Sequence, residues 1–183
     1  MTTNLTLVVC GAPLASRSAA VAAELVKNGW TVTVVGSPAS RQWLDEEAVK
    51  QATGRPALFE QRRADQARGP RPDAVVACPL TMNSGSKAAS GIMDTYATGV
   101  LCDALAMRLP MTIVVMVSSR LWTHPAWSGH LASFAERGAR FVSPLTGRAD
   151  EAPEPVQSGS GPDVVSTFDP IALAGIVGEP ALS

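Results

Sequence analysis

The stretch from Asp73 to Asp103 most constrains what this chain can fold into. It opens with Ala74 to Cys78, a run of small apolar residues that predicts a strand buried on both faces. Pro79 has no N–H and a fixed φ, so we expect it to end the strand ladder. Hydroxyls, an amide and a glycine fill the following turn, Leu80 to Lys87. Ligands of open α/β sheets bind at such turns, although an ordinary turn with a serine N-cap fits equally well.

Apolar strand-like runs and helical patterns alternate along the chain, which predicts an α/β fold. The sheet is expected to be doubly wound and mostly parallel, with helices on both faces and right-handed crossovers. At 183 residues the chain is predicted to be a single domain, 1–183. Besides the run above, strands are predicted at Leu5–Cys10, Thr31–Val35, Ala57–Phe59, Met111–Val117 and Arg140–Val142. Helices are predicted after Ser16, at Arg41–Thr53 with Ser40 as N-cap, and at Ser86–Met107, Gly129–Arg137 and Asp169–Val177.

Composition narrows the class of protein. A net charge of -1 gives no electrostatic reason to bind nucleic acid or an anionic membrane, and no apolar run is long enough to span one. The three cysteines, Cys10, Cys78 and Cys102, have no CxxC spacing, so they are predicted to be reduced thiols in a cytoplasmic protein. We predict no metal site.

Four further segments bear on ligands. The turn Ser37–Ser40 follows the second strand and could bind phosphate or only cap a helix. The turn at Gly11 has one glycine, which argues against a dinucleotide-binding loop. The arginine-rich Gln61–Pro72 is expected to be a solvated loop. The segment Pro144–Pro162 is rich in proline and glycine, and we expect a mobile lid over a substrate at about residues 144–165.

Four stretches together identify a family resemblance. Pro79–Ser84 (PLTMNS) is similar to the PASANT motif of the homo-oligomeric flavin-containing cysteine decarboxylases. Ser37–Ser40 resembles the serine turn that holds the flavin phosphate, and Val115–Trp122 resembles a degraded PxMNxxMW motif. Ser143 and Pro144 lie where the family's substrate lid begins. The family includes phosphopantothenoylcysteine decarboxylase and the peptidyl-cysteine decarboxylases of lanthipeptide, linaridin and thioamitide biosynthesis, and the resemblance favours the peptidyl-cysteine branch. Lys87, Gly91 and Asp94 continue the first motif in register.

The resemblance implies a flavodoxin-like, Rossmann-like fold with FMN at a subunit interface, assembled as a homotrimer or a homododecamer. It implies oxidative decarboxylation of the C-terminal cysteine of a ribosomally made precursor peptide, through a thioaldehyde, to an aminoenethiol used for macrocyclisation. The resemblance also implies site residues, taken from the positions that match the family's motifs. The expected cofactor-binding residues are Gly11, Ala12, Ser37, Ser40, Pro79, Thr81, Met82, Asn83 and Ser84. Arg120 and Trp122 are the expected substrate-binding residues, and the catalytic candidates are Asp65, Asn83, Ser118 and His124.

Two departures from the family pattern bear on catalysis. The family's catalytic histidine precedes the PASANT strand, but Phe59–Asp73 contains no histidine. Asp65 falls at the aligned position, where it is either the base or a surface residue of the arginine-rich loop. Ser118 replaces the asparagine of the second motif. His124 either compensates from a neighbouring subunit or is an ordinary loop residue.

The residues of the expected lid distinguish branches of the family. Phosphopantothenoylcysteine decarboxylase uses a lid cysteine to reduce its enethiol, and Pro144–Val165 contains none. The product is therefore expected to stay oxidised, which favours the peptide-modifying branch. Two alternatives stay open: a catalytically degenerate flavin-binding or regulatory oligomer, and another FMN enzyme of the same fold, such as a prenyl-FMN synthase or a reductase.

Overall fold

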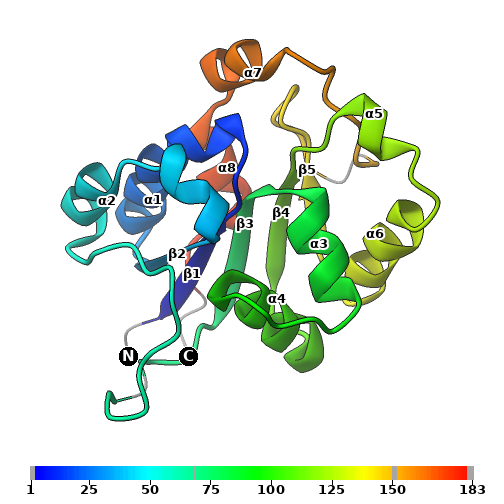
Figure 1. Cartoon of the computed structure of the whole chain (residues 1–183). Coiled ribbons are helices and arrows are strands. Elements are labelled where there is room, and N and C mark those ends of the chain that lie inside the picture. Colours follow the sequence, from blue (N-terminus) through cyan, green and yellow to red (C-terminus); the bar gives the residue numbers. More distant parts are fainter. Residues whose placement is uncertain (1–2, 68, 150–151, 181–183) are drawn as a thin grey trace.

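The computed structural model describes residues 3–67, 69–149 and 152–180. Its described strands form one parallel sheet in the order β2-β1-β3-β4-β5 (Figure 1). The chain runs from β1 out to β2, returns to β3 and continues to β5, so the winding direction reverses between β1 and β3. The predicted doubly wound, flavodoxin-like α/β fold is confirmed. The strands are β1 (Asn4–Val9), β2 (Thr31–Gly36), β3 (Ala74–Leu80), β4 (Met111–Val115) and β5 (Arg140–Val142).

Helices cover both faces of the sheet and build two separate cores. One core lies under α1 (Ser18–Lys27), α2 (Glu46–Thr53), α7 (Gly161–Thr167) and α8 (Pro170–Val177). The other lies under α3 (Met82–Ala89), α4 (Tyr96–Met107) and α6 (Trp127–Glu136). Alternate residues of β1 point into opposite cores, as Leu7 and Val8 do, which explains why this strand is apolar throughout. The short helices η1 (Pro13–Arg17), η2 (Pro38–Gln42) and α5 (Ser119–Trp122) follow β1, β2 and β4.

The single helix predicted over Ser86–Met107 is wrong, because two helices occupy this region. Gly91 has φ +74°, and the Ile92 N–H donates to the Lys87 carbonyl at 2.8 Å, which closes α3. Thr95 then caps α4 through a reciprocal bond pair with Thr98. The two cap signals stop one helix and start the next.

The helix predicted over Arg41–Thr53 begins later than expected, and Ser40 is not its N-cap. Asp45 caps α2 by accepting a hydrogen bond from the Ala48 N–H at 2.9 Å. The Ser40 hydroxyl instead donates to the Ser37 carbonyl at 2.7 Å. The preceding residues form η2, which turns the chain back over the end of β2.

The expectation that Pro79 ends its strand is also wrong. The β3–β4 register shifts between Ala77 and Leu80, but pairing resumes where the Met116 N–H donates to the Leu80 carbonyl at 2.9 Å. Proline lacks only the donor, and the Pro79 carbonyl still accepts from the Cys10 N–H at 3.0 Å. The strand therefore carries the chain up to Thr81.

Two other predicted strands are shorter than expected. Ala57–Phe59 contributes a single bridge in which the Leu58 N–H donates to the Val34 carbonyl at 2.9 Å. The strand predicted over Met111–Val117 ends at Val115.

The segment expected to form a lid packs against the sheet in its middle part. The Val156 N–H donates to the Val117 carbonyl, and the Ser119 N–H donates to the Val156 carbonyl, both at 2.9 Å. Val156 is buried, and the segment ends in α7, which the sequence did not predict. Residues 150–151 lie outside the described residues. Mobility of the segment stays a prediction. No helix among the described residues is long and apolar enough to cross a membrane.

Candidate functional site

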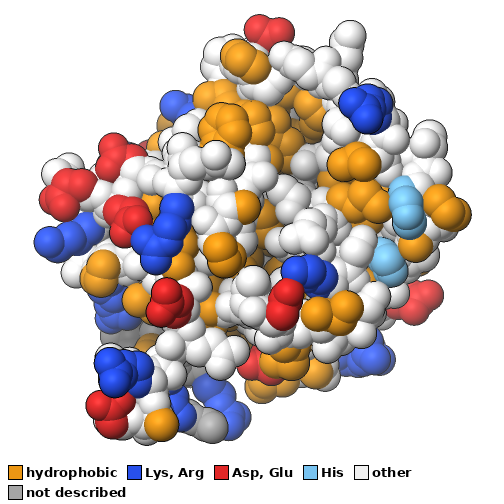
Figure 2. Space-filling model, viewed as in Figure 1, with side chains coloured by type: hydrophobic (Ala, Val, Ile, Leu, Met, Phe, Trp, Pro, Cys, Tyr) orange, Lys and Arg blue, Asp and Glu red, His pale blue; other side chains and the backbone are white. Residues whose placement is uncertain are grey.

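Three turns meet at the carboxyl ends of β1, β2 and β3, next to the point where the winding direction reverses. Open α/β sheets bind ligands at this position. In Figure 2, apolar side chains gather at this end of the sheet below α7, while charged side chains lie toward the rim. The three turns and the elements that directly flank them carry the predicted cofactor-binding residues: Gly11, Ala12, Ser37, Ser40, Pro79, Thr81, Met82, Asn83 and Ser84.

The first two turns touch because glycine allows it. A Cβ added to Gly11 would lie 2.6 Å from the Ala39 Cβ and 2.8 Å from the Ala39 carbonyl oxygen. A Cβ added to Gly36 would lie 2.4 Å from the Phe59 ring. The Ser37 N–H donates to the Val9 carbonyl at 2.8 Å, which ties the second turn to β1. The backbone of the two turns is thus held in one close arrangement.

Polar atoms without a partner lie buried at these two turns. The Ser37 side chain is buried, and its hydroxyl has no hydrogen-bond partner among the described residues. An unsatisfied buried polar group costs about 1–3 kcal/mol, so an acceptor from a ligand would be stabilising there. At the start of α1, the Ser18 hydroxyl and the Arg17 Nε are also buried and have no hydrogen-bond partner among the described residues. A helix N-terminus favours anions, and this set therefore fits a phosphate group.

Sequence reasoning missed Arg17 and Ser18. The available signal was a basic and a hydroxyl residue opening the first helix directly after the first strand. Burial of their polar atoms depends on how η1 packs, for example where a Cβ on Gly161 would lie 2.8 Å from Pro13. Such packing cannot be read from the local pattern.

In the third turn, some of the predicted residues face outward and others are buried. Thr81 occupies the N-cap position of α3 in extended conformation, and its side chain makes no capping bond. Asn83 is exposed, whereas Ser84 is buried and hydrogen-bonded toward Cys10. Burial raises the pKa of the Cys10 thiol, and the weaker opposing effect comes from Ser84 and Thr81. Cys10 is therefore a neutral thiol beneath the turn, and Asn83 is the member that faces outward.

The site residues predicted from the Val115–Trp122 motif follow the carboxyl end of β4, the strand next to β3. Ser118 follows β4 and occupies the N-cap position of α5, where it forms a bridge with Val156. Arg120 is exposed. Trp122 packs edge-on against Trp127, with ring centroids 6.0 Å apart. Ser118 is thus adjacent to the three turns, because β4 is the neighbour of β3.

The two histidines hold local structure. The Nδ1 atom of the exposed His124 accepts a hydrogen bond from the Ala126 N–H at 3.2 Å. The His130 Nδ1 lies 2.9 Å from the Ser86 hydroxyl and links α6 to α3. His130 was not among the predicted site residues.

Asp65 is the predicted site residue that the structure does not bring to the turns. Its side chain is 78% exposed, and its carboxylate lies 3.8 Å from the Arg63 guanidinium. The segment that carries it leads into the amino end of β3, at the opposite end of the sheet from the three turns (Figure 1).

The comparisons with known proteins agree with this geometry. A family model described as Flavoprotein matches residues 1–161. The chain is 28% identical over 147 residues to the coenzyme A biosynthesis bifunctional protein CoaBC of Thermococcus kodakarensis, covering 77% of this chain and 36% of that protein. The chain thus spans about a third of the length of this relative.

Solved structures share the fold. The FMN-dependent cysteine decarboxylase SpaF superposes with a TM-score of 0.65 at 24% identity, covering 77% of this chain and 83% of that one. The FMN-dependent cysteine decarboxylase TvaF from thioviridamide biosynthesis gives 0.66 at 21% identity, covering 78% and 90%.

The orphaned Ser37 hydroxyl, the glycine contact with Ala39 and the start of α1 fit the phosphate arm of a flavin. Ser37, Ser18 and Arg17 would hold the phosphate, and Thr81, Met82 and Asn83 would face the rest of the molecule. The family match confirms that the predicted cofactor is a flavin. With a match over residues 1–161 of 183, this chain belongs to the Flavoprotein family.

Proposed function

We propose that this protein catalyses the FMN-dependent oxidative decarboxylation of the C-terminal cysteine of a ribosomally made precursor peptide. The product is an aminoenethiol suited to macrocyclisation. The observation that carries the proposal is the buried Ser37 hydroxyl, which has no hydrogen-bond partner among the described residues. It lies beside the Gly11–Ala39 contact and supplies a phosphate-binding corner under an apolar surface. The names of SpaF and TvaF, two FMN-dependent cysteine decarboxylases, support the reaction class.

The chemistry balances over the cysteine and the cofactor. When bound, FMN supplies the acceptor for the two hydrogens that leave the cysteine. The Cα–carboxylate bond then breaks, CO2 departs, and a carbon–carbon double bond to the thiol-bearing carbon remains. Asn83, exposed at the mouth of the third turn, can donate its amide N–H to the substrate carboxylate. The apolar surface around the turns keeps water from the reacting carbon.

The base and the assembly belong to the proposal as well. We place Asp65 at the base position because it aligns there. Since Asp65 lies at the opposite end of the sheet from the three turns of its own chain, it could act only on a site in a neighbouring subunit. This requires a homo-oligomer, a homotrimer or a homododecamer. Ile92, Met93 and Met107 are each about half exposed along α4 and the turn before it, an apolar surface that subunit contacts would cover. The proposed compartment is the cytoplasm.

One second candidate has support. CoaBC, the sequence relative, is named for coenzyme A biosynthesis, and this favours phosphopantothenoylcysteine as the substrate. Against it stands Pro144–Val165, which contains no cysteine that could reduce the enethiol.

The test is a direct comparison of the two substrates. The FMN-loaded protein is incubated in air with a peptide ending in cysteine and, separately, with phosphopantothenoylcysteine. The proposal predicts that the peptide loses about 46 Da, the mass of CO2 and two hydrogens, as the cofactor chemistry requires. A loss from phosphopantothenoylcysteine of about 44 Da, which is CO2 alone, or of about 46 Da, which leaves the enethiol unreduced, with no change in the peptide would support the second candidate.

A further inference from the structure

Cys10 lies directly beyond β1 and joins the first turn of the site to the third. Its N–H donates to the Pro79 carbonyl at 3.0 Å, and its carbonyl accepts from the Ala12 N–H at 2.9 Å. Its side chain is 0% exposed and belongs to the core under α3, α4 and α6. One residue is thus bonded both to the Gly11 turn and to the strand that leads into the Thr81–Ser84 turn.

The third turn directs three donors at the Cys10 sulfur. They are the Ser84 hydroxyl, the Thr81 N–H and the Thr81 hydroxyl. Burial raises the pKa of the Cys10 thiol, and the three contacts oppose this only in part, so the sulfur is a neutral acceptor. Ser84 is 4% exposed, so its hydroxyl is buried together with this partner. We call these contacts the Cys10 bridge.

The Cys10 bridge explains why Thr81 does not cap α3. Thr81 is extended at the N-cap position, where a threonine hydroxyl commonly accepts a hydrogen bond from the helix, yet it makes no capping bond. Its hydroxyl contacts the Cys10 sulfur instead. Thr81 therefore does not occupy the N–H groups of Asn83 and Ser84, and the start of α3 keeps donors that suit an oxygen of a ligand.

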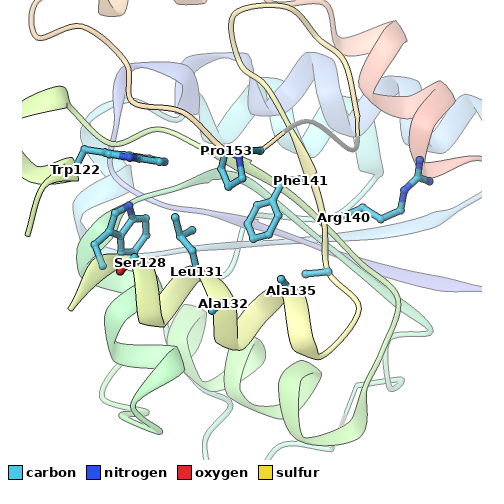
Figure 3. A pocket seen from close by; sticks show the side chains of 11 residues that line it. Trp122, Ser128, Leu131, Ala132, Ala135, Arg140, Phe141 and Pro153 are labelled. Atoms are coloured by element: carbon cyan, nitrogen blue, oxygen red, sulfur yellow. The ribbon is translucent and has the colours of Figure 1, made fainter. Parts of the chain in front are cut away.

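On its other side α3 packs against α6. A Cβ added to Gly85 would lie 3.2 Å from the Trp127 ring. A groove of about 600 Å³, lined by Leu131 of α6 and Phe141 of β5, is open beside α6 (Figure 3). The helix α6 has space to shift there, whereas Cys10 is bonded into the sheet. The Cys10 bridge is therefore the contact that fixes the third turn relative to the first.

We propose that Cys10 and Ser84 are positioning residues that hold the third turn in place for flavin binding. Ser84 acts through the turn and not by touching the cofactor, which differs from the cofactor-binding role expected of it. The Cys10 bridge keeps Thr81 from capping α3 and leaves Asn83 facing outward. The proposal concerns the flavin site alone and does not depend on which substrate is decarboxylated.

The test uses riboflavin, which lacks a phosphate and so does not depend on the Ser37 corner. Fluorescence titration of the flavin-free protein should show that Ser84→Ala and Cys10→Ala each weaken riboflavin binding by about tenfold, as for a lost buried hydrogen bond. Because both changes break the same bridge, the double variant should bind riboflavin as Cys10→Ala does. Cys10→Ser keeps an acceptor and should bind it within about twofold of the unmodified protein.

Cys78→Ala is the matched control. Cys78 is 1% exposed on the neighbouring strand β3, and its side chain belongs to the core on the opposite face of the sheet. Its loss creates a similar cavity without touching the Cys10 bridge, so riboflavin affinity should not change. The visible bands of the bound flavin should shift in Cys10→Ala and keep their positions in Cys78→Ala. Ser84→Ala leaves the core packing in place, so it keeps the test valid if Cys10→Ala does not fold.

Three results would overturn the proposal. The first is a double variant whose loss is the product of the two single losses, because the residues would then act independently. The second is Cys10→Ser binding as weakly as Cys10→Ala. The third is an equal loss in Cys78→Ala, because core packing alone would then explain the effect. Weakened riboflavin binding in a protein that decarboxylates no cysteine substrate would uphold this proposal and remove the proposed function, and turnover with unchanged riboflavin binding would do the reverse.

Discussion

Gly11 and Ala39 lie so close that a Cβ at position 11 would stand 2.6 Å from the Ala39 Cβ. The contact joins the turns after β1 and β2 at the corner where the buried Ser37 hydroxyl has no hydrogen-bond partner in the part of the chain that the structure describes. Gly11→Val should force the turns apart, because backbone atoms of Ala39 cannot yield as a side chain can. We expect FMN affinity to fall by at least about tenfold, the effect of one strained contact of 1–3 kcal/mol. Fluorescence titration with FMN measures it. Gly129→Ala, on an open surface of α6, is the control and should bind FMN normally.

Ser37→Ala tests the phosphate corner separately from the fold. The buried hydroxyl has no partner within residues 3–67, 69–149 and 152–180, so its removal should leave the free protein as stable as before or slightly more stable. FMN affinity should drop about tenfold, and riboflavin affinity should not change, because riboflavin has no phosphate. Arg17→Met should act in the same direction. Ser16→Ala is the matched control, since the exposed Ser16 hydroxyl already donates to the Pro13 carbonyl. If Ser37→Ala weakened the binding of FMN and of riboflavin equally, the phosphate would not bind at this corner.

Asp65→Ala tests the proposed base. Loss of a general base typically lowers turnover by about 10²–10⁴-fold, and FMN binding should not change, because Asp65 lies away from the three turns. Glu60→Gln, an exposed carboxylate change just before the same segment, is the control. Turnover that survives in Asp65→Ala would exclude Asp65, and His124→Ala is then the variant to measure.

The Lys87–Asp94 ion pair, 2.5 Å long, joins α3 to the turn before α4. The hydrogen bond from Lys87 is the main cause that lowers the pKa of the Asp94 carboxyl. A lowered folded-state pKa means that the pair stabilises the fold above the ordinary pKa of aspartate and stops doing so as the pH falls through the folded-state value. Asp94→Asn should therefore reduce the free energy of unfolding at pH 7 and have no effect in strong acid. Urea unfolding at both pH values measures this, with the exposed Asp103→Asn as control. An equal effect at both pH values would contradict it.

The sheet could be predicted because most positions of its strands are apolar and buried, a pattern that is local in the sequence, although the ends of β3 and β4 were not predicted correctly. Helix limits were harder. Asp45, rather than Ser40, caps α2 because the Ser40 hydroxyl is already bonded to the Ser37 carbonyl, a contact set by the turn. The break between α3 and α4 depended on Gly91 taking a positive φ, which glycine permits but does not require.

The candidate site could be predicted to the level of its three turns, since each follows an apolar strand. Arg17 and Ser18 could not, because an unsatisfied buried atom is a property of packing. Asp65 shows the limit of aligning by position, since a gapless count cannot tell which end of the sheet a loop occupies.

The visible spectrum of the purified protein, together with mass spectrometry of the cofactor released on denaturation, shows whether the three turns bind FMN. We predict flavin bands near about 370 and 450 nm, as for an oxidised protein-bound flavin, with FMN in the supernatant. Ser37→Ala should release its FMN more readily on dialysis. A colourless protein that also takes up no added FMN would contradict the assignment of the three turns and the enzyme proposed from them.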